Sequence, residues 1–384
     1  MKLLITTDLY TVTTNGVVTS LKNLRDEMKK RGHDVRVLTF SEDRHSHKDE
    51  EEGVYYISSL SIEKIYPGLR MPLKYRGKLI REIIDWKPDM IHSQCEFFSF
   101  LFARRISKKT GAPIVHTFHT MYEDYAQYVI KAEKFSKWAV RKFCKNRLDR
   151  CQHVIAPTSK VYELLERYEV KSPVSIVPTG ISLEQHKMRI TDDERRKMRE
   201  SFGIPEESVV MVTLGRLGHE KNVDEVINFF NKAKSSCESL RFLIVGDGPA
   251  RSMLEELKTK LSLDGEVIFA GRVDPKEVQK YYQLGDIFAS GSTSETQGLT
   301  YIEAAANGLP LICRKDPCLD DVIEEGVNGY SYTTEEEFLS YIVKMANDSE
   351  WRKNAAERSL EISKVFDKSV FGDSVEAIYD SLLK

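Results

Sequence analysis

Short apolar runs alternate with amphipathic helical patterns along almost the whole chain, and this alternation restricts the possible folds more than any other feature. In the first half we expect helices at 17–31 and 73–86, among others, and strands at 3–6, 35–40, 90–92, 114–117, 153–156 and 174–177. A regular succession of strand and helix predicts βαβ units built around a parallel sheet. The expected fold class is therefore α/β and doubly wound.

The alternation pauses once, at the polar and charged residues 184–206, and then resumes. Strands are expected at 209–214, 241–245, 267–270, 286–289 and 309–312, and helices at 335–346, 349–363 and 367–383. A single hydrophobic core stops growing at about 250 to 300 residues, and this chain has 384. We predict two Rossmann-like domains, at 1–183 and 207–366, that face a central cleft. A linker at 184–206 joins them, and a last helix at 367–384 packs back on the first domain.

Composition excludes several functional classes. No apolar run approaches the roughly 18 residues that span a bilayer, and the amino terminus becomes polar too soon for a signal peptide, so we expect a cytoplasmic protein. The six cysteines form no Cys-x-x-Cys, which disfavours a structural zinc site or a disulfide framework. A net charge of −2 provides no global argument for binding nucleic acid. Any basic surface must therefore be local.

The most informative stretch is 294–310, where Glu295 and Glu303 lie eight residues apart around the start of a helix. Thr300, followed three residues later by Glu303, predicts a capping box. The strand at 286–289 precedes them, so both carboxylates are expected at the carboxyl edge of a parallel sheet, where open α/β sheets bind ligands. An ordinary helix cap and a solvated loop acid would produce the same pattern, so this stretch alone leaves both interpretations open.

A second candidate site is the sequence Gly-Arg-Leu-Gly-His-Glu-Lys-Asn at 215–222, which lies between an expected strand and an expected helix. Arg216, Lys221 and the N–H groups at the helix start bring positive charge together, which suits a diphosphate. Gly246, in the turn Gly-Asp-Gly-Pro, and Gly16, after the first strand, would let backbone approach a ligand. A plain turn explains each of these glycines equally well.

Two histidines lie at or just after the end of the strand expected at 114–117. His116 lies inside the apolar run and is expected to be structural, whereas His119 follows the strand and can reach a site at the sheet edge. The chain contains no Gly-x-Gly-x-x-Gly with a following acidic residue. Nicotinamide binding is therefore disfavoured.

Taken in order, these motifs resemble the family 4 glycosyltransferases of GT-B fold, the retaining, metal-independent group that includes bacterial diacylglycerol glucosyltransferases. The motifs are Asn-Gly-Val at 15–17, His-Thr-Phe-His-Thr at 116–120, Val-Pro-Thr-Gly-Ile at 177–181, Gly-Arg-Leu-x-x-Glu-Lys at 215–221, Gly-Asp-Gly-Pro at 246–249 and Glu-x7-Glu at 295–303. Many members have Glu-Gly-Phe-Gly after the first glutamate, whereas this chain has Glu-Thr-Gln-Gly at 295–298. That variant resembles the glycolipid synthases.

The resemblance implies transfer of glucose from UDP-glucose to diacylglycerol with retention, and no metal or other cofactor. The implied catalytic residues are His119, Glu295, Arg216 and Lys221. The implied donor-binding residues are Gly16, Arg216, Lys221, Gly246, Val273, Glu295, Thr296, Gln297, Gly298, Leu299, Thr300 and Glu303. By this resemblance, Arg216 and Lys221 would stabilise the leaving diphosphate and Glu303 would bind the ribose hydroxyls. In this group the departing phosphate oxygen accepts the proton of the acceptor hydroxyl.

Residues 131–150 carry eight Lys or Arg against two acidic residues. On a helix, Phe135, Trp138, Ala139 and Phe143 would share one side among these bases, a pattern that suits a membrane interface. We therefore expect the protein to lie peripherally on the inner face of the cell membrane, with contacts to anionic lipid from Lys131, Lys134, Phe135, Lys137, Trp138, Arg141, Lys142 and Phe143. An ordinary surface helix with its aromatic residues packed inward fits the same pattern.

The motifs support three alternative functions to different degrees. The catalytic motifs also allow a polysaccharide or other glycan as acceptor. A non-catalytic nucleotide-sugar or membrane-binding module is disfavoured by the intact set of His119, Arg216, Lys221, Glu295 and Glu303. An epimerase on the same fold would need acid/base pairs that the sequence does not show.

Overall fold

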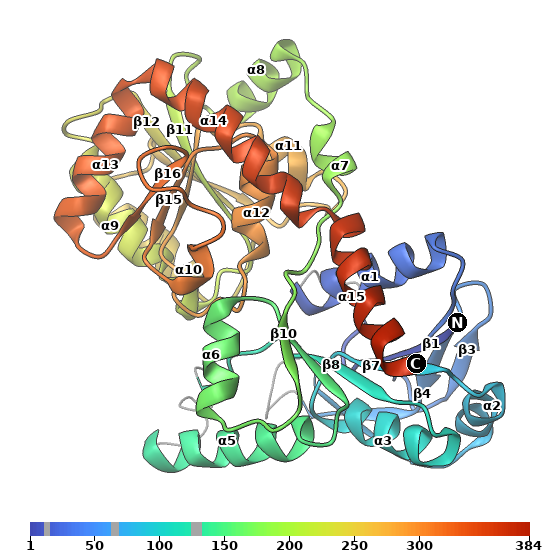
Figure 1. Cartoon of the computed structure of the whole chain (residues 1–384). Helices are drawn as coiled ribbons and strands as arrows, with labels where there is room; N and C mark the ends of the chain where they lie inside the picture. The colour runs from blue at the N-terminus through green and yellow to red at the C-terminus, as the bar shows by residue number, and fades with distance from the viewer. Residues whose placement is uncertain (11–15, 63–68, 124–132) are drawn as a thin grey trace. The chain divides into compact units, whose positions relative to one another are not determined.

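The computed structural model describes residues 1–10, 16–62, 69–123 and 133–384, apart from the side chains of 133–136, and divides into two compact units (Figure 1). Unit 1 comprises Met1–Gly180 and Lys368–Lys384, and unit 2 comprises Ile181–Asp367. The residues expected as a linker, 184–206, fall within unit 2. They contain α8 (Asp192–Ser201) and most of α7 (Leu183–Lys187).

In unit 1 the described residues form a sheet with the order β10-β9-β8-β7-β1-β2-β4-β3, in which only β3 and β4 pair antiparallel. The strands are β1 (Lys2–Thr6), β2 (Asp34–Phe40), β3 (His47–Asp49), β4 (Val54–Ile57), β7 (Met90–Ser93), β8 (Ile114–Thr117), β9 (His153–Ala156) and β10 (Val174–Ile176). The direction of winding reverses between β1 and β7. The carboxyl ends of these two strands are therefore the expected ligand position in unit 1.

Two hydrophobic clusters cover the two faces of this sheet, because successive side chains of a strand point to opposite faces. In β1, Leu4 belongs to one cluster, and Leu3 and Ile5 belong to the other. The covering helices are α1 (Gly16–Lys30), α2 (Lys78–Trp86), α3 (Phe98–Thr110), α5 (Glu133–Leu148), α6 (Ser159–Arg167) and α15 (Lys368–Leu383). The helix predicted from residue 73 begins at Lys78, with Gly77 as its N-cap. It follows the short strand β6 (Arg70–Pro72), which pairs with β5 (Ser59–Ser61).

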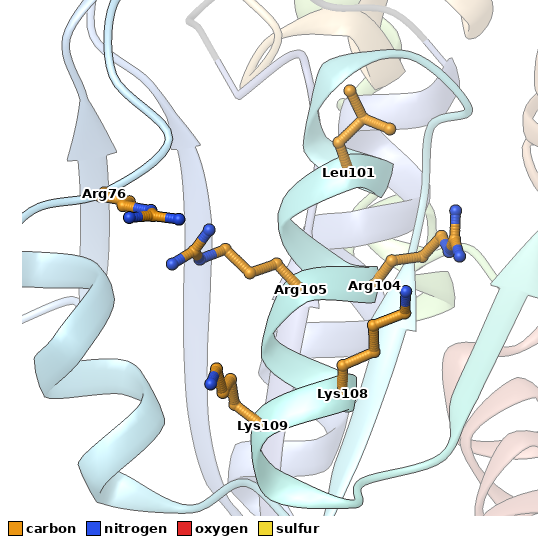
Figure 2. A pocket seen from close by; sticks show the side chains of 6 residues that line it. All are labelled: Arg76, Leu101, Arg104, Arg105, Lys108 and Lys109. Carbon is orange, nitrogen blue, oxygen red and sulfur yellow. The ribbon is translucent and has the colours of Figure 1, made fainter.

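One face of α3 packs into the core and the opposite face carries cations. Phe102, Ala103 and Ile106 are fully buried in the first cluster. On the other face, side chains of α3 and of the loop before α2 line a cavity of about 530 Å³ (Figure 2). Its lining residues are Arg76, Leu101, Arg104, Arg105, Lys108 and Lys109.

The C-terminal helix α15 belongs to unit 1 and packs beside α1. Phe371, Val375 and Tyr379 of α15 lie in the same hydrophobic cluster as Leu21 and Leu24 of α1. The backbones approach closely at Gly372, where a Cβ atom would lie 2.6 Å from the Cγ atom of Glu27. A larger residue at this position would therefore push α15 away from α1.

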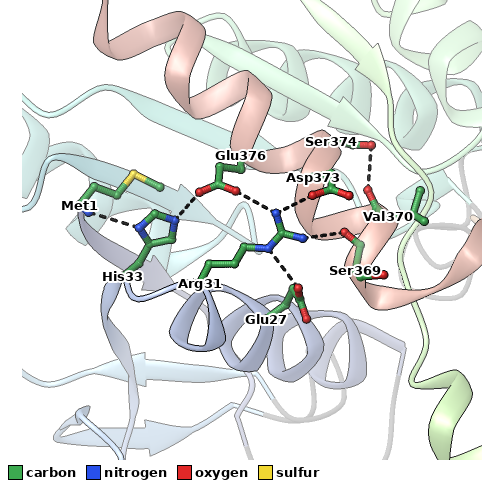
Figure 3. A network of polar contacts seen from close by, with 9 residues as sticks. All are labelled: Met1, Glu27, Arg31, His33, Ser369, Val370, Asp373, Ser374 and Glu376. Carbon is green, nitrogen blue, oxygen red and sulfur yellow. Dashed lines mark hydrogen bonds and ion pairs between the residues drawn. The ribbon is translucent and has the colours of Figure 1, made fainter.

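Polar contacts around Arg31 also hold α15 to unit 1 (Figure 3). The guanidinium contacts Glu27 at 3.0 Å, Asp373 at 2.7 Å and Glu376 at 2.8 Å, and donates to the backbone oxygen of Ser369 at 2.8 Å. His33 links the amino group of Met1 to the carboxylate of Glu376. We call this set of contacts the Arg31 clasp.

Unit 2 contains a parallel sheet with the order β13-β12-β11-β14-β15-β16. Its strands are β11 (Val209–Leu214), β12 (Leu240–Val245), β13 (Val267–Gly271), β14 (Ile287–Ser290), β15 (Leu311–Arg314) and β16 (Gly329–Tyr332), and its further helices are α9 (Val223–Ala233), α10 (Arg251–Lys260), α11 (Val278–Tyr282), α12 (Leu299–Ala306), α13 (Glu335–Asn347) and α14 (Ser349–Ser363). The winding reverses between β11 and β14, so their carboxyl ends form the ligand position of a doubly wound sheet.

Helix α8 explains why residues 184–206 resemble a linker. Thr191 and Glu194 form a capping box at its start, and Arg195 and Arg199 bind the carboxylate of Asp286 at 2.7 Å each. Arg199, which is buried, also donates to the backbone oxygen of Leu284. The helix is thus anchored largely by polar contacts, which a search for hydrophobic periodicity does not detect.

Candidate functional site

The loops after β11 and β14 meet at the point where the sheet of unit 2 reverses its winding. Lys221, at the end of the first loop, forms a short ion pair with Glu295 in the second. The hydroxyl of Ser292 donates to the same carboxylate oxygen at 2.9 Å. The structure therefore brings together a cation and a carboxylate that are 74 residues apart in sequence.

Arg216 begins the same loop and is also held by a carboxylate. It forms a short ion pair with Glu220, one turn further along the chain. Asn222 adopts a left-handed conformation before α9, and its side-chain amide donates to the backbone oxygen of Gly291 at 3.0 Å. This contact ties the loop after β11 to the loop after β14. Both cations belong to the loop after β11, which leads into α9.

Gly246, after β12, has a packing role in this structure. Its φ is +133°, and a Cβ atom built there would lie 1.8 Å from the backbone oxygen of Gly215. The neighbouring Asp247 accepts a hydrogen bond from the backbone N–H of Leu217 at 3.0 Å through its own backbone oxygen. The Gly-Asp-Gly-Pro turn therefore lets the loop that carries Arg216 lie directly against it.

The structure corrects the predicted capping box at Thr300. Helix α12 begins at Leu299, and its N-cap is Gly298, with φ +72° and no side-chain cap. Thr300 therefore lies within the first turn. The backbone N–H groups of a first helical turn lack partners within the helix, so the start of α12 can donate hydrogen bonds to an anion. Thr296 and Gln297 lead into this turn, and the Gln297 side chain is buried.

Glu303 lies further along α12 and contacts a residue that the sequence did not indicate. The phenol of Tyr282, from α11, donates to the Glu303 carboxylate at 2.8 Å. Burial raises the pKa of Glu303 to about 7, although this hydrogen bond acts in the opposite direction. The Glu303 side chain can therefore change its protonation state near neutral pH.

The last predicted donor-binding residue of unit 2 is Val273, which follows β13 and is partly buried against the core. Residues that follow β11, β12, β13 and β14 thus all lie at one edge of the sheet, as parallel strands require. Among the described residues, no group of three His, Cys, Asp or Glu side chains could hold a metal ion.

In unit 1, His119 follows β8 and pairs with Gln94, which follows β7. The distance from His119 Nε2 to Gln94 Oε1 is 2.6 Å. Burial, with a smaller effect from the neighbouring His116, lowers the pKa of His119 to about 3. The ring is therefore neutral at physiological pH, and the contact with the Gln94 oxygen favours the form with hydrogen on Nε2. Gln94 is recognisable in the sequence only as a polar residue just after a strand.

The structure agrees with a structural role for His116. It is fully buried, and its Nε2 lies 3.1 Å from a carboxylate oxygen of Glu96. The other oxygen of Glu96 accepts a short hydrogen bond from Tyr122.

Asp8, just after β1, accepts hydrogen bonds from the backbone N–H groups of Phe98 and Ser99 at the start of α3. Burial raises the pKa of Asp8 to about 6. No motif in the sequence distinguishes Asp8.

Gly16 is the first residue of α1, and residues 11–15 before it lie outside the described part of the chain. Lys131 also lies outside it, as do the side chains of Lys134 and Phe135. The structure therefore says nothing about these three predicted membrane contacts.

The structure corrects the prediction for Phe143 on α5. Phe143 packs against the core and lies 5.4 Å from Phe97 between ring centroids, whereas Trp138 is 54% exposed. The reason is geometric, because residues five apart on an α-helix differ by about 140° in direction. Around Trp138, Lys137 and Lys142 are exposed, and the Lys142 ammonium lies 4.9 Å from the Trp138 ring. Arg141 pairs with Glu169 at 2.8 Å.

Comparison with known proteins accounts for nearly the whole chain. The model of Glycosyltransferase Family 4 matches residues 14–185, and that of Glycosyl transferases group 1 matches 194–361. The chain is 31% identical to an alpha-monoglucosyldiacylglycerol synthase of Streptococcus pneumoniae, over 90% of this chain and 78% of that protein. It is 29% identical to an alpha-monoglucosyldiacylglycerol synthase of Acholeplasma laidlawii, over 100% of this chain and 98% of that protein.

Solved structures agree with the predicted fold. Anabaena Alr3699/HepE in complex with UDP-glucose superposes with a TM-score of 0.77 at 18% identity, covering 99% of this chain and 100% of that one. WaaG, a glycosyltransferase involved in lipopolysaccharide biosynthesis, superposes with a TM-score of 0.75 at 16% identity, covering 98% and 99%. The expected GT-B fold is confirmed.

Proposed function

Because this chain belongs to the family 4 glycosyltransferases and is a hexosyltransferase, we propose that it transfers glucose from UDP-glucose, with retention, to diacylglycerol at a membrane surface. The observation that carries the proposal is the similarity to two alpha-monoglucosyldiacylglycerol synthases over 90% and 100% of this chain. In this proposal unit 2 binds the nucleotide sugar and unit 1 binds the acceptor.

The diphosphate of the donor would occupy the edge of unit 2 that carries Arg216 and Lys221. Both cations are already oriented by carboxylates, so a phosphate can replace or share those partners with little movement. The start of α12 adds N–H donors on the side of Glu295. Charge that develops on the leaving diphosphate would then meet donors already in position, which is the main way that such a site lowers a barrier.

Glu303 would accept hydrogen bonds from the ribose hydroxyls. A carboxylate accepts through both oxygens, whereas a protonated carboxyl has less capacity to accept. Since burial raises the pKa of Glu303 to about 7, donor affinity should depend on pH around neutrality. Tyr282 holds one carboxylate oxygen in place and leaves the other for the ribose.

His119 would contact the donor sugar near its anomeric carbon. Its lowered pKa keeps the ring neutral, so it would act as a hydrogen-bonding group and not as a cation. Gln94 would orient the ring through the 2.6 Å contact. The departing phosphate oxygen would take the proton of the acceptor hydroxyl, which removes the need for a separate carboxylate base.

Contact with the membrane would use the exposed part of α5. Trp138, Lys137 and Lys142 combine an aromatic side chain with positive charge, as interfacial helices do. Phe143 has no part in this contact, because it packs against the core. No helix in the described part of the chain is both long and apolar enough to span a bilayer.

The decisive experiment incubates the purified chain with labelled UDP-glucose, UDP-galactose and UDP-N-acetylglucosamine, with and without vesicles that contain diacylglycerol. The expected result is a lipid-soluble glucoside that forms only with UDP-glucose and only with diacylglycerol. Transfer to an added glycan, with none to diacylglycerol, would favour the glycan-acceptor alternative. Binding of the donor without any transfer would favour the non-catalytic module.

A further inference from the structure

The outer face of α3 concentrates positive charge that no other part of the described chain neutralises. Leu101, Arg104, Arg105 and Lys108 recur at spacings of three and four residues, so they share one side of the helix. Arg76 and Lys109 complete the lining of the cavity. We call this set the α3 groove. From residue 97 to residue 122 the sequence contains no Asp or Glu, so no acidic residue lies nearby along the chain.

Several exposed cations elsewhere in the protein have carboxylate partners. Lys48 contacts Glu82 at 2.7 Å, Lys232 contacts Glu335 at 2.6 Å, and Arg358 contacts Glu324 at 2.7 Å. Within the described residues, none of the five cations of the α3 groove forms an ion pair. The Nε atom of Arg105 is even buried without a hydrogen-bond partner. A buried donor left without an acceptor is unfavourable, so this atom indicates a missing partner.

Neighbouring charges make the arrangement less favourable still. Arg104 with Lys108, and Arg105 with Lys109, are like-charge pairs four residues apart, which destabilise a helix. Burial and the charge of Arg150, which lies in the turn after α5, lower the pKa of Arg104. Positive charge therefore extends beyond the groove.

The geometry suits a phosphate group. Figure 2 shows the guanidinium groups of Arg76 and Arg105 turned toward each other, while Arg104 and Lys108 extend in another direction from the same face of α3. Guanidinium forks bind phosphate oxygens in pairs, and ammonium groups add charge without fixing geometry. A cavity of about 530 Å³ lies within the usual range for small-ligand sites.

We propose that the α3 groove is a second anion site, separate from the donor site of unit 2, that binds the phosphate group of a phosphoester ligand. Two sources would present this chemistry: the headgroup of an anionic phospholipid, or a free phosphoester in solution. The inference does not rest on the proposed reaction, because it concerns binding to unit 1 only.

The test compares the full-length protein with two triple variants. The groove variant carries Arg104→Gln, Arg105→Gln and Lys108→Gln. The control variant carries Arg196→Gln, Lys197→Gln and Lys232→Gln, which removes the same charge from cations that have carboxylate partners. Binding of sn-glycerol 3-phosphate is measured by calorimetry, and binding to phosphatidylglycerol vesicles by sedimentation.

The expected result is that the groove variant binds glycerol phosphate on the order of tenfold more weakly, while the control matches the parent. Loss of vesicle binding in the same variant, on the order of 100-fold, would identify the lipid headgroup as the source. Unchanged vesicle binding would identify a free phosphoester. Lys221→Ala, which alters the donor site, should leave glycerol phosphate binding unchanged.

The proposal is overturned if the parent and the groove variant bind glycerol phosphate equally well, or if the parent binds none. A groove that only solvates the surface of α3 would produce these results. If the triple variant does not fold, Arg104→Lys with Arg105→Lys keeps the charge and removes both guanidinium forks. Glycerol phosphate affinity should then still fall severalfold, and parental affinity would contradict the proposal.

Discussion

The cations at the donor edge of unit 2 and those of the α3 groove differ in how their charge is balanced. Arg216 and Lys221 each contact a carboxylate, Glu220 and Glu295. The cations of the α3 groove have no carboxylate partner among the described residues. Positive charge alone therefore does not define a phosphate site. A carboxylate partner fixes the orientation of a cation and also reduces the positive potential that the cation produces around it.

The two arrangements suit different tasks. A paired cation is held in one position, so it can stabilise charge that develops at one point during a reaction. An unpaired group of cations projects its field further and attracts an anion from solution or from a surface. We therefore expect substitutions at the donor edge to change turnover, and substitutions in the α3 groove to change binding.

The largest effect is expected at the donor edge. Lys221→Ala or Arg216→Ala should lower kcat by roughly 10² to 10³-fold, because each removes charge stabilisation from the leaving diphosphate. Steady-state transfer from UDP-glucose measures this. The control is Lys232→Ala, another paired cation, which should leave kcat unchanged. Turnover within threefold of the parent for both variants would contradict the roles of these two residues.

A second comparison concerns the basic side chains of α5. Changing Lys137, Arg141 and Lys142 to glutamate should weaken sedimentation with phosphatidylglycerol vesicles on the order of 100-fold, since each base near an anionic surface contributes about 1 kcal/mol. Affinity for UDP-glucose in solution should stay unchanged. Binding should also weaken with added salt. If the variant still glucosylates vesicle lipid at the parental rate, α5 is an ordinary surface helix.

Substitutions in the Arg31 clasp would measure how much a paired cation contributes to the free energy of unfolding when its role is structural. Arg31→Ala leaves the buried carboxylate of Glu27 without its partner, so we expect a loss of about 2 kcal/mol in the free energy of unfolding of unit 1. Denaturant titration measures this. Adding Glu27→Gln should recover part of the loss. Arg358→Ala, which breaks two exposed ion pairs, should leave the free energy of unfolding nearly unchanged.

A smaller effect is expected from the titration of Glu303. Its pKa is raised from 4.5 to about 7, so the ionised form, which accepts the ribose hydroxyls, is lost as pH falls through 7. Affinity for UDP should therefore be roughly tenfold weaker at pH 6 than at pH 8. Glu303→Gln should remove this dependence. Calorimetry at the two pH values measures both, and an equal pH dependence in the variant would assign it to another group.

The same carboxyl affects stability with the opposite sign. A raised pKa means that the folded state favours the protonated form, so its contribution to stability is fully present below pH 4.5 and is lost as pH rises through about 7. Stability should therefore decrease over the pH range in which donor affinity increases. Thermal unfolding of the parent and of Glu303→Gln across this range would reveal the difference.

The smallest effect is expected from chelation. If cations alone stabilise the diphosphate, added EDTA should leave transfer within about twofold of its value in untreated protein. The assay uses the parent enzyme with UDP-glucose and diacylglycerol vesicles. Abolition of transfer by EDTA, with recovery on addition of manganese, would mean that Arg216 and Lys221 do not act without a metal.

The sequence by itself determined the alternation of strand and helix, and hence the two α/β sheets. It also determined that the residues of 215–222 and 294–300 follow strands, which is enough to place them at one edge of a parallel sheet. These are local properties, because hydrophobic periodicity and turn residues act over a few positions. A helix anchored by polar contacts has little hydrophobic periodicity, and so α8 resembled a linker.

Only the tertiary structure decided which side chains become partners. The pairing of Lys221 with Glu295, of His119 with Gln94 and of Tyr282 with Glu303 depends on contacts between separate elements. The inward direction of Phe143 was decided in the same way, by the core beneath α5. A pattern along one helix shows which residues share a face, but only the packing of neighbouring elements decides which face is buried and which charges remain unpaired.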